Sequence, residues 1–449
     1  MVRITAPKID AGHPAFNPIF PSSESPKTTL VYPDTPPLSS FSSETDLSLK
    51  YSFATVAPED EPVVAVIGVG YVGTHLVSSF SSQYQVIGFD VSERRIHDLQ
   101  KEFKGNKNVR FSRDQSDLIS ATHFLISVPT LLRPDKTIDS SYLCDALKMV
   151  GRVARRGSTV VIESSVAVGM TRQLLGPVAM ARGLFAGMSP ERVDPGRTEP
   201  PVKSIPKIIS GLDDILPGSL DAINRIYSTI FDNVVTVSKS EVAEMMKLYE
   251  NCQRMVCIAY ANEMADACIP HGIDPYEVCA AASTKPFGYM PYAPGLGVGG
   301  HCIPVNPFYL LSNSNFPLLE ACSVAMNNRP AKLAQRLLAS LPQERMSSNR
   351  APHILVVGMG FKAGQSQLDN SPGVDLARSL AVSGAVKLTW ADSLVKQEAI
   401  PQIPRLGDEL WNKRFLETFD VIVVAMKQHK MDFDLLNKLE GVRVESWCR

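Results

Sequence analysis

The strongest structural signal is the stretch Val63-Val64-Ala65-Val66-Ile67-Gly68-Val69-Gly70-Tyr71-Val72-Gly73. A continuous apolar run that ends in glycine is typical of a strand buried on both faces of a parallel sheet. A helix is expected from Tyr71 to about Phe80. The first glycine permits a tight turn, the second lets the backbone approach a pyrophosphate, and the third allows close packing of the helix on the sheet. The stretch therefore predicts a dinucleotide site at a helix N-terminus.

An acidic residue follows the next predicted strand, Gln85–Phe89. Asp90 stands at the right distance to accept hydrogen bonds from a ribose 2′-hydroxyl. Its charge would repel a 2′-phosphate, which favours NAD over NADP as the cofactor. Arg94 and Arg95 argue the other way, because either could pair with a phosphate. An incidental glycine turn is the alternative, although strand, spacing and acid agree.

Other segments extend this pattern. Strands are expected at 124–128 and 159–162, alternating with helices. A helix is expected from about Ser240 to His271, with Gly272 as its stop. A third region opens at His353 with a second strand-to-glycine layout, and a further strand is expected at 420–425. We therefore expect an α/β protein with two Rossmann-like, doubly wound parallel-sheet domains joined by a central long-helix domain.

The domain boundaries follow from these segments. Residues 1–57 are rich in Pro and Ser and are expected to form a disordered extension. A dinucleotide-binding domain is expected over 58–220, a central helical domain with a cysteine loop over 221–335, and a C-terminal α/β domain over 336–449.

Composition and charge point to small-molecule partners. The chain carries 45 basic and 46 acidic residues, so a nucleic-acid or membrane partner is not expected. No apolar run approaches the roughly 20 residues that span a bilayer, and the start lacks the pattern of a secretion signal, so we expect a cytoplasmic protein. The eight cysteines lack paired C-x-x-C spacing and no metal site is expected.

One cysteine stands out in the loop Pro294-Gly295-Leu296-Gly297-Val298-Gly299-Gly300-His301-Cys302-Ile303-Pro304. Its glycines let a ligand approach the backbone, and loops commonly carry reactive groups. Cys302 is therefore a candidate nucleophile, and a structural cysteine is the alternative. Lys247 and Asn251, four residues apart on the predicted helix, project together as a candidate oxyanion site. The same spacing also fits a solvated helix surface.

Taken in order, these segments resemble the nucleotide-sugar 6-dehydrogenase family, the UDP-glucose/GDP-mannose dehydrogenases, from about residue 62 to about 430. The matching segments are Gly68 to Gly73, Val128-Pro129-Thr130, Glu163-Ser164-Ser165-Val166, Ser189-Pro190-Glu191-Arg192, Lys247-Leu248-Tyr249-Glu250-Asn251, Asn262-Glu263 and Gly299 to Pro304. The stretch Thr284 to Tyr289 is most similar to the branch of UDP-N-acetylglucosamine and UDP-N-acetylmannosamine 6-dehydrogenases.

The resemblance implies two successive oxidations of a sugar C6 alcohol to a uronic acid, with two NAD consumed. Cys302 would attack the aldehyde-level intermediate as a thiolate, and a thioester would then be hydrolysed. Lys247 and Asn251 would hold the oxyanion. Glu191 would activate water, helped by Ser165, which stands where the family usually has threonine. Family members commonly form homo-oligomers through the central helical region.

The resemblance also assigns the remaining site residues. The expected catalytic set is Cys302, Lys247, Asn251, Glu191, Ser165 and Asn306. The expected cofactor-binding residues are Gly68, Gly70, Tyr71, Val72, Gly73, Asp90, Arg95, Thr130 and Ser165. The expected substrate-binding residues are Glu191, Arg192, Lys247, Asn251, Gly299 and Lys362, the last from a C-terminal domain that would bind the nucleotide sugar.

Two positions depart from the family pattern. Asn306 replaces the aspartate of C-x-P-x-D, and an amide cannot take a proton. Asp369 replaces an arginine expected to face the cofactor phosphates, a reversal that would cost roughly 1–3 kcal/mol of affinity. These departures motivate two alternatives: a nucleotide-sugar-binding homologue with impaired catalysis, and a two-electron alcohol dehydrogenase.

Overall fold

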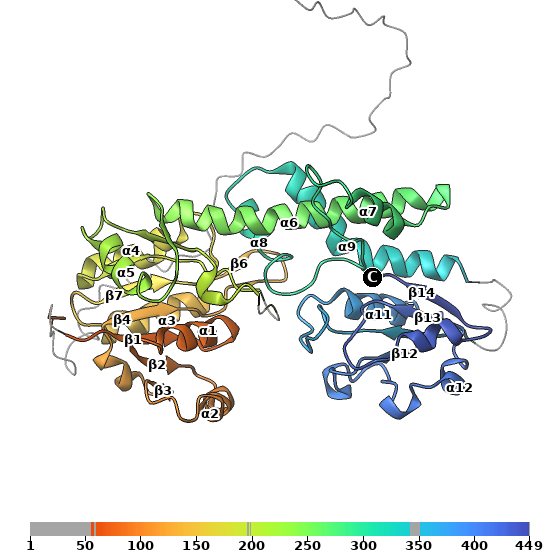
Figure 1. Ribbon diagram of the computed structural model, residues 1–449, viewed down its shortest axis with the longest axis horizontal. Helices are drawn as coiled ribbons and strands as arrows, with labels where there is room; N and C mark the ends of the chain where they lie inside the picture. The colour runs from red at the N-terminus through yellow and green to blue at the C-terminus, as the bar shows by residue number, and fades with distance from the viewer. Residues whose placement is uncertain (1–54, 58–59, 195–196, 198, 342–350, 449) are drawn as a thin grey trace, which may run out of the picture.

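The computed structural model describes residues 55–57, 60–194, 197, 199–341 and 351–448. The extension expected over 1–57 therefore lies almost wholly outside the described residues. Two α/β units lie at opposite ends of the molecule, and one long helix spans the distance between them (Figure 1). This arrangement matches the expected fold class.

The first unit is built on an eight-stranded sheet. Its strands are β1 (Val63–Ile67), β2 (Gln85–Phe89), β3 (Val109–Ser112), β4 (His123–Ile126), β7 (Thr159–Ile162), β8 (Phe185–Met188), β9 (Lys207–Gly211) and β10 (Val234–Thr236). Their order is β10-β9-β8-β7-β4-β1-β2-β3, and all neighbours are parallel except β8 and β9. The strands predicted from buried apolar runs are confirmed.

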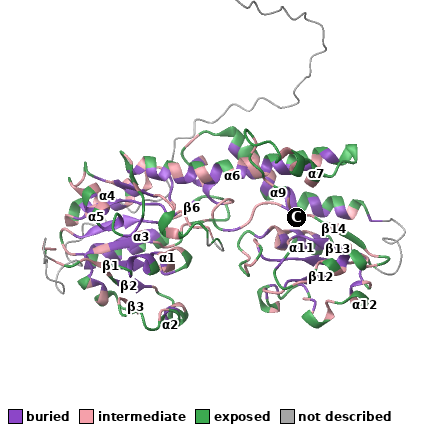
Figure 2. Ribbon diagram, in the orientation of Figure 1, coloured by how far each residue is buried: buried purple, intermediate pink, exposed green. Residues whose placement is uncertain are grey.

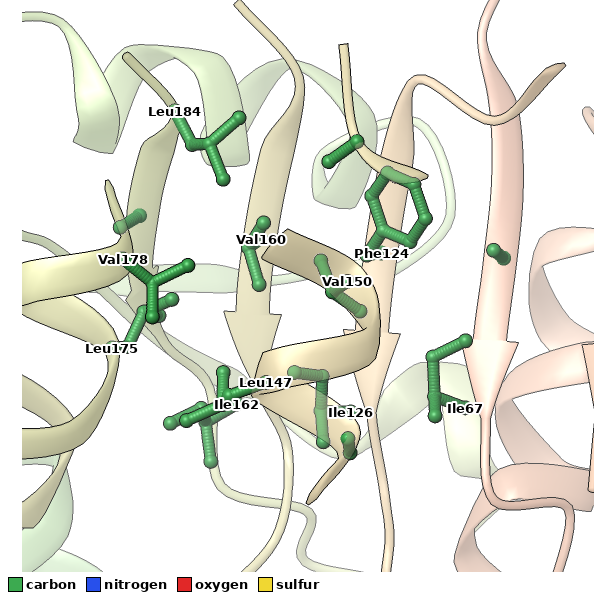
Figure 3. Close-up of a cluster of buried hydrophobic side chains, with 14 of the residues drawn as sticks. Ile67, Phe124, Ile126, Leu147, Val150, Val160, Ile162, Leu175, Val178 and Leu184 are labelled. Atoms are coloured by element: carbon green, nitrogen blue, oxygen red, sulfur yellow. The ribbon is translucent and has the colours of Figure 1, made fainter. Parts of the chain in front are cut away.

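Helices cover this sheet. They are α1 (Tyr71–Phe80), α2 (Glu93–Glu102), α3 (Ser141–Val153), α4 (Met170–Arg182) and α5 (Ser219–Tyr227), and a short hairpin of β5 (Leu131–Leu132) and β6 (Ile138–Asp139) precedes α3. β1, β4 and β7 present branched side chains to this layer, where Ile67, Ile126 and Ile162 pair in register. Leu147 and Val150 of α3 pack against them (Figure 3).

This packing positions the loops that follow the strands. Because β1, β4 and β7 run in parallel and end in one row of buried isoleucines, the segments after Ile67, Ile126 and Ile162 emerge at the same edge of the sheet. Ligands of open α/β sheets bind outside the carboxyl ends of the strands. β10 pairs with β9 and so belongs to the first sheet. We therefore propose that the first domain ends after Thr236, rather than at the residue 220 expected from the sequence.

The central unit is dominated by α6 (Ser240–Cys268), a helix of 29 residues. A 3-10 turn at Ile269–His271 and the left-handed Gly272 (φ 64°) end it, as predicted. α7 (Pro275–Ala282), α8 (Asn306–Leu311) and α9 (Pro317–Ala339) pack against α6. Apolar residues such as Leu248 and Met255 lie on its buried face, but others are exposed: Tyr249 is 71% exposed and Tyr260 is 62% exposed.

The C-terminal unit repeats the strand-to-glycine layout on a smaller scale. β11 (His353–Val357), β12 (Lys387–Ala391), β13 (Val421–Val424) and β14 (Arg443–Ser446) form a parallel sheet in the order β12-β11-β13-β14. α11 (Pro372–Val382) lies between this sheet and α9, and α12 (Lys413–Leu416) is short. Most residues of β11, β12 and β13 are buried, whereas β14 at the edge of the sheet is mostly exposed (Figure 2).

Candidate active site

One cavity of about 810 Å³ brings most of the predicted site residues together. It runs from the glycine turn after β1 to the cysteine loop. The predicted residues that line it are Gly68, Gly70, Tyr71, Val72, Asp90, Thr130, Ser165, Glu191, Lys247, Cys302 and Asn306. Dinucleotide-binding and nucleophile-bearing segments that are far apart in sequence therefore share one space.

The glycine turn fits a phosphate-bearing cofactor. Gly68 has a φ of 84°, and a Cβ on Gly73 would lie 2.0 Å from the carbonyl oxygen of Gly68. Nothing lies within 4 Å of the Cβ position of Gly70, which faces open space. No side chain of the described residues caps α1, and its first turn carries no acid. The N–H groups of its first turn and the helix dipole therefore favour an anion.

Asp90 and Arg95 brace this turn. Asp90 Oδ2 accepts a hydrogen bond from the backbone N–H of Val69 (3.0 Å), and Oδ1 accepts one from that of Ser92 (2.9 Å). A carboxylate has about four acceptor positions, so capacity remains for ribose hydroxyls. Arg95 Nε donates to the Val69 carbonyl (2.8 Å) and its terminal nitrogen donates to Thr74 Oγ1 (2.7 Å). The guanidinium is thus occupied by the turn rather than directed to a 2′-phosphate.

Loops after β4 and β7 are tied together beside the turn. Thr130 Oγ1 donates to the carbonyl of Ser165 (2.7 Å), and Ser164 Oγ donates to that of Val128 (2.7 Å). Tyr309 of α8 reaches the same cavity wall, and burial raises its pKa to about 12. Its hydroxyl therefore stays protonated and remains a potential donor.

The cysteine and the lysine lie in one electrostatic environment. Lys247 is buried on the inner face of α6, and burial lowers its pKa. The charges of Cys302, Glu191 and Glu250 act in the opposite direction and favour the ammonium form. Cys302 is partly exposed in the cavity wall. An ammonium that shares a cavity wall with a cysteine can stabilise an oxyanion that forms on a carbon bound to the sulfur.

Asn251 is placed behind this pair rather than in the cavity lining. It is buried, and its amide nitrogen donates to Asn306 Oδ1. Arg254 donates in turn to Asn251 Oδ1. Asn306 begins α8, and its backbone N–H donates to the carbonyl of Cys302 (2.9 Å). The amide at 306 therefore retains the acceptor function that a carboxylate would have, without its charge.

Glu191 belongs to a buried ionic cluster with Lys207 and Glu163, two residues to which the sequence motifs assigned no role. Lys207 Nζ donates to Glu163 Oε2 and to Glu191 Oε2, both at 2.7 Å, and Tyr227 donates to Glu163 Oε1. Burial alone would raise the pKa of Glu191, but Lys207 and the backbone N–H of Arg192 outweigh it and lower the pKa. Glu191 is thus a fixed carboxylate. The available signal in the sequence was Lys207 at the start of an apolar strand, where a lysine needs a buried partner.

Besides Asn251, three further predicted substrate residues do not line the cavity. Arg192 donates to the carbonyl of Pro206 (2.8 Å) and pairs with Glu250. Lys362 pairs with Asp194 across the two α/β units (3.0 Å). Gly299 faces the C-terminal unit instead, since a Cβ there would lie 2.9 Å from Phe361 Cβ. Their contacts with a substrate remain predictions.

Neither a metal site nor a membrane span was expected. No group of three or more His, Cys, Asp or Glu within the described ranges could hold a metal ion. Among the helices that the structure describes, none is both long and apolar enough to cross a bilayer.

Fold and site together define an NAD-dependent oxidoreductase of the nucleotide-sugar dehydrogenase class. Comparison with known families agrees: the UDP-glucose/GDP-mannose dehydrogenase NAD binding domain matches residues 63–231, and the central domain of the same family matches residues 241–328. The chain belongs to the UDP-glucose/GDP-mannose dehydrogenase family.

Individual relatives narrow the resemblance to one branch. The chain is 33% identical to a UDP-N-acetyl-D-glucosamine 6-dehydrogenase of Pseudomonas aeruginosa over 346 residues, 71% of this chain and 80% of that protein. It is 31% identical to a UDP-N-acetyl-D-mannosamine dehydrogenase of Pyrococcus horikoshii over 386 residues, 81% and 88% of the two chains. The structure of a UDP-D-ManNAc dehydrogenase of P. horikoshii superposes with a TM-score of 0.75 at 26% identity, covering 86% of this chain and 99% of that one.

Proposed function

We propose that the protein oxidises the C6 alcohol of a UDP-N-acetylhexosamine, or of a related UDP-hexose, to the uronic acid through a thioester on Cys302. The supporting observation is that Cys302 and Lys247 line the same cavity as the glycine turn. The names of the relatives favour the N-acetylated substrates. The C-terminal domain is proposed to hold the nucleotide, with Lys362 among its contacts.

The chain's residues would act in sequence. NAD, held by the glycine turn and Asp90, supplies the hydride acceptor for both oxidations. At the aldehyde level the Cys302 thiolate forms a C–S bond to C6, and the Lys247 ammonium stabilises the resulting oxyanion. Asn251 and Asn306 keep this region of α6 against the cysteine loop.

Hydrolysis completes the sequence. After the second oxidation, water adds to the thioester carbon, the C–S bond breaks and the thiolate leaves with its electron pair. The carboxylate of Glu191 would accept a proton from that water, while Ser165, in the same cavity wall, would orient it. The lowered pKa of Glu191 keeps the group ionised and ready to accept.

The test is product counting with purified full-length chain. UDP-N-acetylglucosamine, UDP-N-acetylmannosamine, UDP-glucose and GDP-mannose are each incubated with NAD, and NADH and acid are measured per sugar consumed. We expect two NADH per sugar and no acid from Cys302→Ala. Cys144→Ala, on α3 outside the cavity lining, is the matched control and should retain activity. Full acid formation by Cys302→Ala would contradict the mechanism.

Two other functions give different results in the same experiment. Binding of UDP-sugars in calorimetry without NADH from any of them would support the impaired homologue that Asn306 and Asp369 suggested. One NADH per sugar, unaffected by thiol alkylation, would support a two-electron dehydrogenase.

We also propose a homo-oligomer that forms through the outer face of α6. This outer stripe exposes large apolar side chains along the helix, namely Val242, Met245, Tyr249, Tyr260 and Met264. Contiguous exposed apolar surface is typical of protein–protein contacts. A cytoplasmic location is proposed from the cysteines, since all eight are free, as in reducing compartments.

A further inference from the structure

Asp369 is the position at which this chain reverses a charge, and it lies in the wall of the active-site cavity. It belongs to the segment Gln367–Pro372, between β11 and α11 of the C-terminal unit. An unpaired carboxylate that faced the cofactor phosphates would weaken binding of the cofactor, as expected from the sequence. The contacts of Asp369 show a different arrangement.

The backbone of this segment is bonded to the cysteine loop. The N–H of Gly300 donates to the carbonyl of Asp369 (2.8 Å), and the Asn370 side-chain amide donates to the carbonyl of Gly300 (2.9 Å). A Cβ on Gly299 would lie 3.0 Å from the carbonyl oxygen of Asn370 and 2.9 Å from Cδ of Pro372. The loop glycines therefore serve this contact between domains.

The side chain of Asp369 extends the same contact to the neighbour of Cys302. Its Oδ2 lies 3.2 Å from Nε2 of His301, and the two side chains are 51% and 49% exposed. Phe361 packs edge-on against the same imidazole, with ring centroids 6.5 Å apart. The carboxylate of Asp369 therefore lies within ion-pair distance of the residue that precedes Cys302.

The carboxylate of Asp369 is therefore not an isolated negative charge in the cavity wall. It lies beside the His301 imidazole, and Arg133 and Lys136 of the β5–β6 hairpin supply cations to the same cavity wall. Asp369 contacts the cysteine loop through both its backbone and its side chain. These contacts, rather than contacts with the phosphates of a bound cofactor, account for its position.

We propose that Asp369 is a positioning residue that holds His301 and thereby the Cys302 loop, and that position 369 does not bind the cofactor phosphates in this protein. The proposal rests on the nucleophilic role proposed for Cys302. It assigns to the reversed charge a function that arginine at this position could not perform, because arginine would replace the carboxylate beside the His301 imidazole with a cation.

The test combines Asp369→Asn, Asp369→Glu, Asp369→Arg, His301→Asn and the double variant Asp369→Asn/His301→Asn. Three quantities are measured: the rate at which iodoacetamide alkylates Cys302 in ligand-free protein, the Kd for NAD by calorimetry, and kcat. Asp369→Asn and His301→Asn should each raise the alkylation rate and lower kcat by up to about fivefold, the range for a half-exposed ion pair. The double variant should be no worse than either single one.

The other variants separate positioning from cofactor binding. Asp369→Glu keeps a carboxylate and should restore most of the wild-type alkylation rate. Asp369→Arg should lower kcat while the Kd for NAD stays within about threefold. Asp375→Asn, which removes a carboxylate that lines the same cavity but pairs with Arg378 (2.9 Å), controls for charge alone and should leave the alkylation rate unchanged.

Two results would overturn the proposal. One is additivity of the Asp369→Asn and His301→Asn effects, because uncoupled residues do not act through one contact. The other is a tightening of NAD binding by about tenfold or more in Asp369→Arg with kcat unchanged, as expected if the position faces the phosphates. If the wild-type protein formed no NADH, the proposed function would fail, but the alkylation rates and Kd values would still test the coupling.

Discussion

Lys207 Nζ lies 2.7 Å from Oε2 of Glu191, and both side chains are almost completely excluded from solvent. The same ammonium lies 2.7 Å from Oε2 of Glu163, so one cation is shared between two carboxylates. Burial opposes the charged form of Lys207, but the two carboxylates outweigh it and raise its pKa. Glu191, the proposed water-activating carboxylate, is therefore held in place by Lys207, which does not line the active-site cavity.

Replacing Lys207 with methionine should destabilise the fold strongly. Two buried carboxylates would lose their cation, and such a loss typically costs about 3–5 kcal/mol. Chemical denaturation followed by circular dichroism gives the free energy of unfolding. Lys203→Met removes an exposed lysine of the same segment and should change stability by less than about 0.5 kcal/mol. A Lys207→Met variant as stable as the control would show that the cluster does not stabilise the fold.

Stability should fall as pH rises through neutrality because of Glu163. Burial raises the pKa of this carboxyl from 4.5 to about 7, against the attraction of Lys207. A folded pKa above the unfolded value gives stabilisation that is complete below about pH 4.5 and is lost as pH rises through about 7. We expect a loss on the order of 3 kcal/mol between pH 5 and 8.

Glu163→Gln isolates that contribution, since glutamine does not titrate. Its unfolding free energy, measured at several pH values, should lack the decrease, whereas Glu102→Gln on the exposed side of α2 should retain it. Parallel pH curves for Glu163→Gln and wild type would mean that another group titrates.

Asn306 should be replaceable by aspartate but not by alanine. It is 2% exposed and accepts the amide hydrogen of Asn251. Asn306→Ala leaves that buried donor unsatisfied, which costs about 1–3 kcal/mol, and should lower kcat. Asn306→Asp keeps the acceptor and should retain more stability than the alanine variant. A large gain of kcat in Asn306→Asp would instead identify Asn306 as the cause of impaired turnover.

Charges on the outer stripe of α6 should separate the subunits. Tyr249→Asp/Tyr260→Asp places two carboxylates where the proposed contact buries aromatic rings, so light scattering coupled to size exclusion should report a smaller species. Tyr142→Asp changes a tyrosine that is 53% exposed on α3 and should leave the mass unchanged. Equal masses for all three proteins would contradict an interface on this stripe.

Local signals account for what the sequence predicted well. The strands at β1, β2, β4, β7, β11 and β13 are continuous apolar runs, and a buried parallel strand needs little more than that. The glycines at 68, 70 and 73 stand where the turn needs a positive φ or leaves no room for a side chain against the backbone or a ligand. Gly272 ends α6 because it adopts a left-handed conformation. Cys302 and Lys247 were found through their motifs, and they line a common cavity.

Through-space relations account for what was missed. The polar residues Lys247 and Asn251 lie on the buried face of α6, which packs against α8. Their four-residue spacing alone fitted both a buried site and a solvated helix surface. Lys207 and Glu163 are 44 residues apart, and only the pairing of the sheet brings them together. The partner of Asp369 is a histidine in another domain, which no local pattern indicates.

The close contact of Gly299 and Gly300 with Phe361, Asn370 and Pro372 limits how this protein can be recombined. A chimera that takes its C-terminal half from a relative would bring a foreign residue to position 369 against the native His301. Such a chimera should be active only when the loop from Pro294 to Pro304 is transplanted with the C-terminal half. The cysteine loop of the central domain and the C-terminal domain therefore have to be exchanged together.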